Sequence, residues 1–203
     1  GRIVRNYSGG IAAILEQKSA TPEQLAIREI NAGVYIFRAK PFWDHLDELE
    51  PNVASGEYYL TDMVEILRRH NHPVFPFPVA DETELLGINT RVELAVADEI
   101  LRARKNREMM LSGVTIENPG TVCIDPDVVI GPDTILEPGV QLRGRTTVGK
   151  NCLIGTGSIL RDCEIGDSVE ILPYVVAQDT HVHAGAAVGP FSRLRMHADV
   201  GEG

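Results

Sequence analysis

The fold of this chain is decided by residues 128–142, which read VVIGPDTILEPGVQL. Within this stretch an aliphatic residue returns at every sixth position, at Ile130, Leu136 and Leu142. Gly131 follows the first of them, and glycine suits a tight corner because it has no Cβ. This period predicts the hexapeptide repeat of a parallel β-helix, in which each repeat forms one side of a triangular coil.

The same spacing extends in both directions along the chain. The aliphatic positions are, in order, Ile124, Ile130, Leu136, Leu142, Val148, Ile154, Leu160, Ile165, Ile171, Val176, Val182, Val188, Leu194 and Val200. Steps of five residues lead to Ile165 and to Val176, and all other steps are of six. We expect these side chains to point inward and to stack on their equivalents in neighbouring coils. At three repeats per coil, the fourteen positions predict between four and five coils.

The residues before 114 show the mixed pattern of an α/β domain. Strand signals lie at 1–3, 33–37 and 73–79, and helix signals begin at Thr21 and Met63. Residues 90–112 then predict one long helix that ends at Gly113. The predicted organisation is therefore an α/β part over 1–89, a connecting helix over 90–113 and a left-handed β-helix over 114–203.

Composition and charge limit the classes of partner. The formal net charge is −10, and phosphates and anionic lipids attract basic surfaces, so we expect neither nucleic-acid nor membrane binding. The sequence shows no signal peptide and no apolar run long enough for a membrane span, and we expect a cytoplasmic protein. The three cysteines Cys123, Cys152 and Cys163 form no CxxC pair, so we expect buried apolar residues rather than zinc ligands.

Eight short segments carry a resemblance to one enzyme family. They are residues 1–5 (GRIVR), 14–18 (ILEQK), 20–24 (ATPEQ), 29–33 (EINAG), 56–62 (GEYYLTD), 87–91 (GINTR), 111–115 (LSGVT) and 189–195 (GPFSRLR). With the hexapeptide repeats, they resemble the bacterial bifunctional N-acetylglucosamine-1-phosphate uridyltransferase/glucosamine-1-phosphate acetyltransferases. The resemblance covers essentially the whole chain and implies that residues 1–89 are the sugar-binding, C-terminal part of a Rossmann-like nucleotidyltransferase domain.

The resemblance implies two reactions that together make UDP-N-acetylglucosamine for peptidoglycan and lipopolysaccharide synthesis. Acetyl passes from acetyl-CoA to glucosamine-1-phosphate, and UTP then gives its uridylyl group to the product, with release of pyrophosphate. It also implies a homotrimer through the β-helix, with Mg²⁺ at the nucleotidyl-transfer site. Two alternatives stay open: another sugar-1-phosphate nucleotidyltransferase with a β-helix tail, and a non-catalytic trimerisation module.

The resemblance assigns sugar-nucleotide binding to Gly1, Glu16, Asn31 and Asn89. Gly1 would let the backbone approach the sugar, Glu16 would accept hydrogen bonds from hydroxyls, and Asn31 would bond to the sugar or its substituents. Glu57 and Tyr58 would shape the same pocket. From the residues alone, Glu16 is equally a solvated acid at a strand end, and Asn31 is a turn former before Gly33.

Two further residues receive roles from the resemblance. Asn89 would give an amide oxygen to Mg²⁺, which prefers oxygen ligands, and otherwise it would cap the helix that starts near Thr90. Arg195 would bind substrate in the acetyltransferase site, and otherwise it is a solvated coil residue. Met196-His197 departs from the Pro-Gly usual in the family, which puts the corner after Arg195 in doubt.

The resemblance places no catalytic residue in this chain. The family's nucleotide loop would lie before Gly1 and its acetyltransferase histidine after Gly203, so we expect a segment that catalyses neither reaction alone. Two His-x-His pairs, at 70 and 72 and at 181 and 183, lack a nearby carboxylate in the sequence. We expect these histidines to be exposed and inert.

Overall fold

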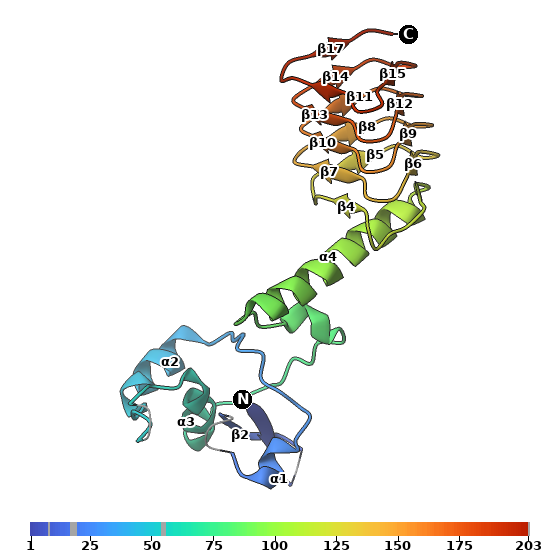
Figure 1. Cartoon of the computed structure of the whole chain (residues 1–203). Coiled ribbons are helices and arrows are strands. Elements are labelled where there is room, and N and C mark those ends of the chain that lie inside the picture. The colour runs from blue at the N-terminus through green and yellow to red at the C-terminus, as the bar shows by residue number, and fades with distance from the viewer. Residues whose placement is uncertain (8, 17–19, 54–55, 203) are drawn as a thin grey trace. The chain divides into compact units, whose positions relative to one another are not determined.

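The computed structural model describes residues 1–7, 9–16, 20–53 and 56–202 (Figure 1). Gln17 and Lys18 of the segment 14–18, and Gly203, lie outside the described residues. The chain divides into two compact units, Gly1–Gly87 and Ile88–Gly203. None of the described helices has the length and apolarity that crossing a bilayer requires.

The second unit contains three parallel sheets of five strands each, which form the faces of a left-handed β-helix of five coils (Figure 1). The first face comprises β3 (Thr115–Ile116), β6 (Ile135–Leu136), β9 (Leu153–Ile154), β12 (Glu170–Ile171) and β15 (Ala187–Val188). The second face comprises β4 (Cys123–Ile124), β7 (Gln141–Arg143), β10 (Ile159–Arg161), β13 (Val176–Gln178) and β16 (Arg193–Leu194). The third face comprises β5 (Val129–Ile130), β8 (Thr147–Val148), β11 (Glu164–Ile165), β14 (His181–Val182) and β17 (Asp199–Val200).

The predicted inward positions form one continuous core. Leu136, Leu142, Ile154, Leu160 and Ile171 are completely buried. Each strand pairs in register with the strand three positions along the chain, so equivalent side chains stack from coil to coil. The prediction that aliphatic residues six positions apart form the core of the β-helix is therefore confirmed.

One inward position was predicted wrongly. Val176 is 43% exposed, whereas Ala177 is 2% exposed and lies in register between Leu160 and Leu194. The second five-residue step therefore falls between Ala177 and Val182. Alternate side chains of a strand point to opposite faces, so the larger aliphatic residue faces outward and the small alanine fills the core.

Buried hydroxyls occupy several positions two residues before the inward aliphatics. Thr134 Oγ1 donates to Gly149 O (2.8 Å) and accepts from the Cys152 N–H (3.1 Å). Ser158 Oγ donates to Leu172 O (3.1 Å) and accepts from the Val175 N–H (3.1 Å). A buried backbone group needs a hydrogen-bond partner. These hydroxyls supply one to the backbone N–H and C=O groups at corners, where the hydrogen bonds between strands stop.

A long helix, α4 (Arg91–Leu111), leads into the first coil. Thr90 caps it, in a capping box with Glu93, and Gly113 follows its C-cap with φ +99°. The predicted helix over 90–112 is therefore confirmed. Asn106 is 1% exposed, and its Nδ2 donates to Pro119 O (2.8 Å) and Val122 O (3.1 Å), which ties the helix to the β-helix.

Substitution of Asn106 by alanine tests this attachment. Asn106→Ala removes the donor from two carbonyl oxygens, and we expect it to lower the free energy of unfolding by about 2 kcal/mol. Guanidinium chloride unfolding followed by circular dichroism measures the change. The control Arg107→Ala alters an exposed neighbour on the same helix and is expected to change stability by less than about 0.5 kcal/mol. Equal effects of the two substitutions would contradict the anchoring role.

The first unit is built on the antiparallel pair β1 (Arg2–Arg5) and β2 (Ile11–Leu15). Its other elements are α1 (Pro22–Leu25), α2 (Ala39–His45), η2 (Leu46–Glu48), η3 (Leu60–Asp62), α3 (Met63–Arg69) and η4 (Glu82–Leu85). Ile3, Ile11 and Ile14 pack with Val64 of α3. The helix starts predicted at Thr21 and Met63 are confirmed, and Thr21 closes a capping box.

The strands predicted at 33–37 and 73–79 are wrong. Neither segment pairs with another strand in the described part of the chain, and Ile36 and Phe77 are 100% and 91% exposed. An apolar, β-favouring sequence becomes a strand only where a partner supplies the ladder of hydrogen bonds. The described residues of this unit contain one two-stranded sheet, so the Rossmann-like sheet expected for residues 1–89 is not seen in them.

Candidate functional site

Three of the predicted binding residues lie together at one end of β1. The antiparallel register places Arg2 opposite Leu15, and an isolated bridge joins Arg2 to Ile30. Glu16 and Asn31 therefore flank Gly1 on its two sides. The Gly1 nitrogen lies 3.8 Å from Glu16 Oε2, and the Asn31 N–H donates to Gly1 O at 3.0 Å.

Two residues that the sequence did not single out complete this group. Thr61 Oγ1 donates to Glu16 Oε1 (3.2 Å), and Asn31 Nδ2 donates to the hydroxyl oxygen of Tyr35 (2.6 Å). Thr61 is 6% exposed and is the middle residue of η3, which leads into α3. Its place in the segment 56–62 was the available signal, because that segment already carried the resemblance. We call Gly1, Glu16, Asn31, Tyr35 and Thr61 the β1-end site.

The β1-end site combines one acidic group with neutral hydrogen-bonding groups. Burial raises the pKa of the Tyr35 phenol, and the nearby Glu16 carboxylate raises it further, against the opposing effect of the Asn31 hydrogen bond. Burial also raises the pKa of Asp62, with smaller contributions from Glu65 and Glu16. An amide, two hydroxyls and a carboxylate suit a ligand rich in hydroxyl groups, such as a sugar.

Gly1 has a steric reason to be glycine. A Cβ at this position would lie 2.8 Å from Cγ2 of Ile14, 3.2 Å from the carbonyl oxygen of Leu15 and 3.3 Å from Glu16 Oε1. A larger residue would displace the Glu16 carboxylate or the β2 side chain beneath it. The absence of a side chain therefore keeps the polar groups of the β1-end site accessible.

Glu57 and Tyr58 lie in a loop closed by its own contacts. Pro51 and Tyr58 form an antiparallel bridge, and the Asn52 N–H donates to Glu57 O at 2.8 Å. Tyr59 donates its hydroxyl to Glu57 Oε2 at 3.3 Å, and Tyr58 is 64% exposed. A role for Glu57 and Tyr58 in shaping a sugar pocket stays a prediction.

Asn89 belongs to the second unit, and it is not the cap of α4. Thr90 accepts from the Glu93 N–H at 3.1 Å, while the backbone N–H of Asn89 donates to Glu93 Oε2 at 2.8 Å. Hydrogen bonds from the backbone N–H of Asn89 and from Thr90 lower the pKa of Glu93, because they favour its ionised carboxylate. The exposed amide of Asn89 is therefore left to offer an oxygen to a cation, and one such oxygen fits a Mg²⁺ ion whose remaining ligands are phosphate and water oxygens.

Arg195 also lies in the second unit, at the end of β16. It is exposed and lines a shallow depression with Val176, Gln178, Arg193 and Met196. Its carbonyl oxygen accepts from Ala198 N–H (3.0 Å), which holds the corner, while the guanidinium faces solvent. A free guanidinium beside a second arginine suits an anionic group such as phosphate.

Comparisons with known proteins show which family the chain resembles. Residues 127–162 match the family model described as bacterial transferase hexapeptide (six repeats). The chain is 46% identical over 213 residues to the bifunctional protein GlmU of Solibacter usitatus, a match that covers 96% of this chain and 46% of that protein. It is 42% identical to the bifunctional protein GlmU of Enterococcus faecalis, over 99% of this chain and 44% of that protein.

The chain belongs to the GlmU family. It spans about half the length of the curated GlmU relatives that it matches. Among solved structures, the acetyltransferase domain of PglB from Neisseria gonorrhoeae in complex with acetyl coenzyme A aligns at 19% identity and a TM-score of 0.27, over 48% of this chain and 60% of that domain.

Met196-His197, which stands where the resemblance led us to expect Pro-Gly, leaves the coil intact. His197 adopts the left-handed conformation that glycine favours, with φ +62°. Its N–H donates to Asp179 O (2.6 Å), and its Nδ1 lies 3.0 Å from Asp179 Oδ2. The chain continues through this corner into β17, so the corner survives the substitution.

The cysteines are buried as predicted, and the histidines have carboxylate neighbours that the sequence did not indicate. All three cysteines are free and buried, and burial raises the pKa of the Cys152 and Cys163 thiols. Both His-x-His pairs, however, have a carboxylate partner that is distant in sequence. Glu48 contacts His70, and Asp199 contacts His183.

Proposed function

We propose that the first unit is the sugar-binding part of a Rossmann-like nucleotidyltransferase domain and that the β-helix begins an acetyltransferase domain. The whole protein would make UDP-N-acetylglucosamine by acetyl transfer to glucosamine-1-phosphate and uridylyl transfer from UTP. The convergence of Gly1, Glu16 and Asn31 in the β1-end site carries this proposal, because the three come from separate segments. We propose a cytoplasmic location, since UTP and acetyl-CoA are available there.

In the β1-end site each residue has a distinct task. Glu16 would accept hydrogen bonds from sugar hydroxyls, and Asn31 would bond to the sugar or its N-acetyl group. Thr61 orients the Glu16 carboxylate, and Tyr35 orients the Asn31 amide, so both ligand-binding groups are pre-arranged. Pre-arranged polar groups hold a substrate in one position, which is the main requirement for in-line attack on a nucleotide phosphate.

For the nucleotidyl transfer, Asn89 would contribute one protein oxygen to Mg²⁺. When bound, the ion neutralises phosphate charge during the transfer. Asn89 is suited to this because the capping box of α4 is completed by Thr90 and Glu93, which leaves its amide uncommitted. In the β-helix, Arg195 would bind the phosphate of the acetyl acceptor.

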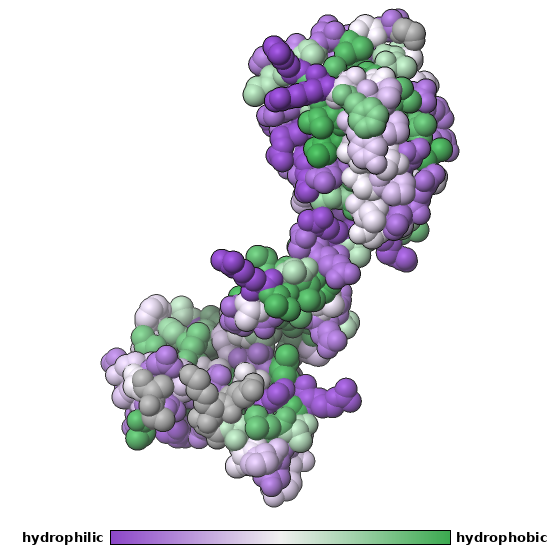
Figure 2. Space-filling view, in the orientation of Figure 1, coloured by the Kyte–Doolittle hydropathy of each residue, from purple (hydrophilic) through white to green (hydrophobic). Residues whose placement is uncertain are grey.

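We propose that the β-helix forms a homotrimer through its first and second faces. Aliphatic side chains point outward there in register, Ile135 beside Leu153 and Ile159 beside Val176. Ile135 and Val176 are 37% and 43% exposed, and Figure 2 shows apolar residues on the outer surface of the β-helix. On the third face the outward residues of β11, β14 and β17 are Glu164, His181 and Asp199, while Val129 of β5 is 62% exposed. Burial of the aliphatic rows between subunits would remove them from water.

A Glu16→Ala variant of the full-length protein tests the sugar site. We expect the affinity for UDP-N-acetylglucosamine, measured by isothermal titration calorimetry, to fall about 10–100-fold, because hydrogen bonds to a charged group contribute about 1.5–3 kcal/mol each. The control Glu50→Ala removes an exposed carboxylate from the same unit and should leave the affinity unchanged. Acetylation of glucosamine-1-phosphate should also be unchanged in both variants.

Two outcomes would count against the proposed function. If Glu16→Ala binds UDP-N-acetylglucosamine with unchanged affinity, the proposal that the β1-end site binds the sugar is wrong. A full-length protein that forms trimers but neither binds the sugar nucleotide nor acetylates the amine would favour the non-catalytic trimerisation module.

A further inference from the structure

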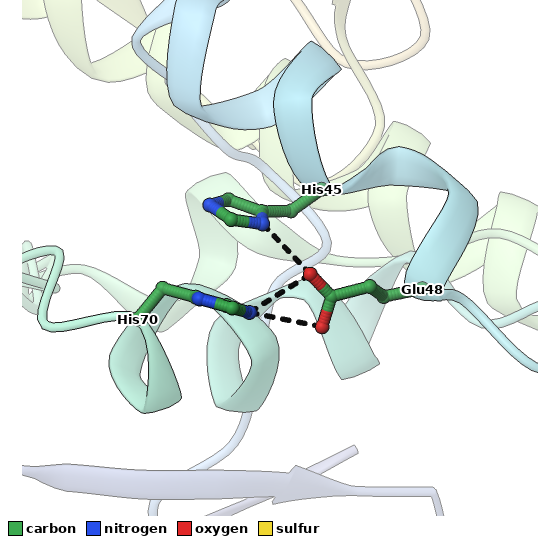
Figure 3. A group of neighbouring side chains, drawn as sticks. All are labelled: His45, Glu48 and His70. Carbon is green, nitrogen blue, oxygen red and sulfur yellow. Dashed lines mark hydrogen bonds and ion pairs between the residues drawn. The ribbon is translucent and has the colours of Figure 1, made fainter.

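Two histidines and a glutamate from three elements of the first unit meet at one point (Figure 3). His45 ends α2, Glu48 ends η2, and His70 is the C-cap of α3. Figure 3 shows both imidazole rings turned toward the carboxylate of Glu48. The site lies outside the residues used in the proposed function. The sequence marked only His70, as part of a His-x-His pair, because 22 residues separate it from Glu48.

The three side chains direct their ligand atoms to the same place. His45 Nδ1 lies 2.7 Å from Glu48 Oε1, and His70 Nε2 lies 2.8 Å from the same oxygen. The two rings stack at 3.8 Å between centroids, with planes 18° apart. One carboxylate oxygen therefore faces two ring nitrogens, and a cation shared by all three groups requires the stacked rings to turn until both in-plane lone pairs point at it.

Burial and charge also favour a cation here. The side chain of His45 is 18% exposed, and those of Glu48 and His70 are 36% and 38% exposed, so the group is sheltered but open on one side. An imidazole binds a metal through the lone pair of an unprotonated ring nitrogen, so two imidazoles and one carboxylate would make a donor set of net charge −1.

The donor set selects the class of metal. Two imidazole nitrogens and one carboxylate oxygen are typical ligands of Zn²⁺, whereas Mg²⁺ and Ca²⁺ prefer oxygen alone. With metal–ligand bonds of about 2.0–2.1 Å, tetrahedral geometry separates neighbouring ligand atoms by about 3.3 Å. The nitrogen–oxygen distances of 2.7 and 2.8 Å would have to widen by about half an ångström.

We propose that His45, Glu48 and His70 form a binding site for Zn²⁺ or a similar divalent transition metal, with the fourth position open to water. The His72 ring lies 5.6 Å from that of His45 and outside the three ligands, so it borders the site without completing it. The bound ion joins the end of α2 and η2 to the end of α3. It therefore stabilises the first unit by linking these short elements.

A second group, His181, His183 and Asp199, supplies an internal comparison. These side chains are 49%, 39% and 72% exposed, and a single short contact, from His183 Nε2 to Asp199 Oδ1 (2.8 Å), joins the carboxylate to the rings. Greater exposure and fewer contacts make this group a weaker ligand set. Replacing His181 and His183 removes this second group, so that it does not contribute to the measured metal binding.

The test uses the tag-free 203-residue chain carrying His181→Gln and His183→Gln, stripped of metal by a chelator. We expect isothermal titration calorimetry to give one Zn²⁺ per chain with a micromolar or lower Kd, and no binding of Mg²⁺. Glu48→Gln and His70→Gln should each weaken Zn²⁺ binding at least about tenfold, and His72→Gln should change it less than about threefold. Co²⁺ in place of Zn²⁺ should give the visible absorption of a four-coordinate ion.

Two results would overturn the proposal. Zn²⁺ binding that is unchanged in Glu48→Gln and His70→Gln would assign the metal to another part of the chain. Failure of the background chain to bind Zn²⁺ more tightly than about 1 mM would show that the group is only a hydrogen-bonded cluster. The Co²⁺ spectrum needs no change to the three ligands, so a variant that fails to fold cannot obscure the outcome.

Discussion

Ile171→Ala is expected to lower the free energy of unfolding of the β-helix by about 3 kcal/mol. Ile171 is completely buried on β12 and stacks in register between Ile154 and Val188. Truncation to alanine removes apolar contacts on both sides and leaves a cavity that rigid coils cannot close, and such changes cost about 2–5 kcal/mol. The neighbouring Glu170→Ala is the matched control, because Glu170 lies on the same strand and points to solvent.

The two units allow this effect to be localised. The chain has one tryptophan, Trp43, which lies in the first unit, so its fluorescence reports unfolding there. Far-ultraviolet circular dichroism reports both units. In guanidinium chloride, Ile171→Ala should shift the β-helix transition to lower denaturant and leave the Trp43 transition in place. A loss no larger than that of Glu170→Ala would contradict the layered core.

Gly155→Ala should destabilise the same unit by about 3 kcal/mol, through crowding instead of a cavity. A Cβ at Gly155 would lie 2.7 Å from the carbonyl carbon of Leu172 and from the nitrogen of Pro173, and 2.8 Å from the carbonyl oxygen of Ile171. All three atoms belong to the backbone of the next coil, which cannot rotate away as a side chain can. The expected result is a lower denaturant midpoint by circular dichroism.

Gly120→Ala is the control for this substitution. The nearest atom to a Cβ at Gly120 is Asn118 Oδ1, at 3.7 Å, which is ordinary contact. We expect a change within about 0.5 kcal/mol. Comparable losses of stability in Gly155→Ala and Gly120→Ala would contradict the steric argument. They would show that the close approach of the next coil does not exclude a side chain at position 155.

The β-helix was largely determined by its sequence. A strand of the β-helix can be predicted from its inward residue alone. The residue that stacks on it is then the equivalent one three repeats along the chain. The exception is instructive, because Val176 met the sequence pattern and Ala177 took the core position. The sequence could not show which residue of the pair faces inward, since that depends on the register with Leu160 in the coil below.

In the first unit the sequence determined the local features and the tertiary structure decided the rest. The cap at Thr21 depends on Gln24, three positions away, so it was predictable. In the second unit the sequence offered Asn89 as the cap of α4, whereas Thr90 takes that place. The strands expected at 33–37 and 73–79 failed because strand formation depends on a distant partner.

The same distinction applies to the candidate sites. Gly1, Glu16 and Asn31 were identified through resemblance, but Thr61 entered the site only through a hydrogen bond that spans 45 residues. The cluster of His45, Glu48 and His70 was wholly a product of the fold, which brings the end of α3 against η2. Contacts between residues that are close in sequence, or that repeat at a fixed period, can be predicted from the sequence. Contacts between distant segments depend on how the chain packs, so only the tertiary structure shows them.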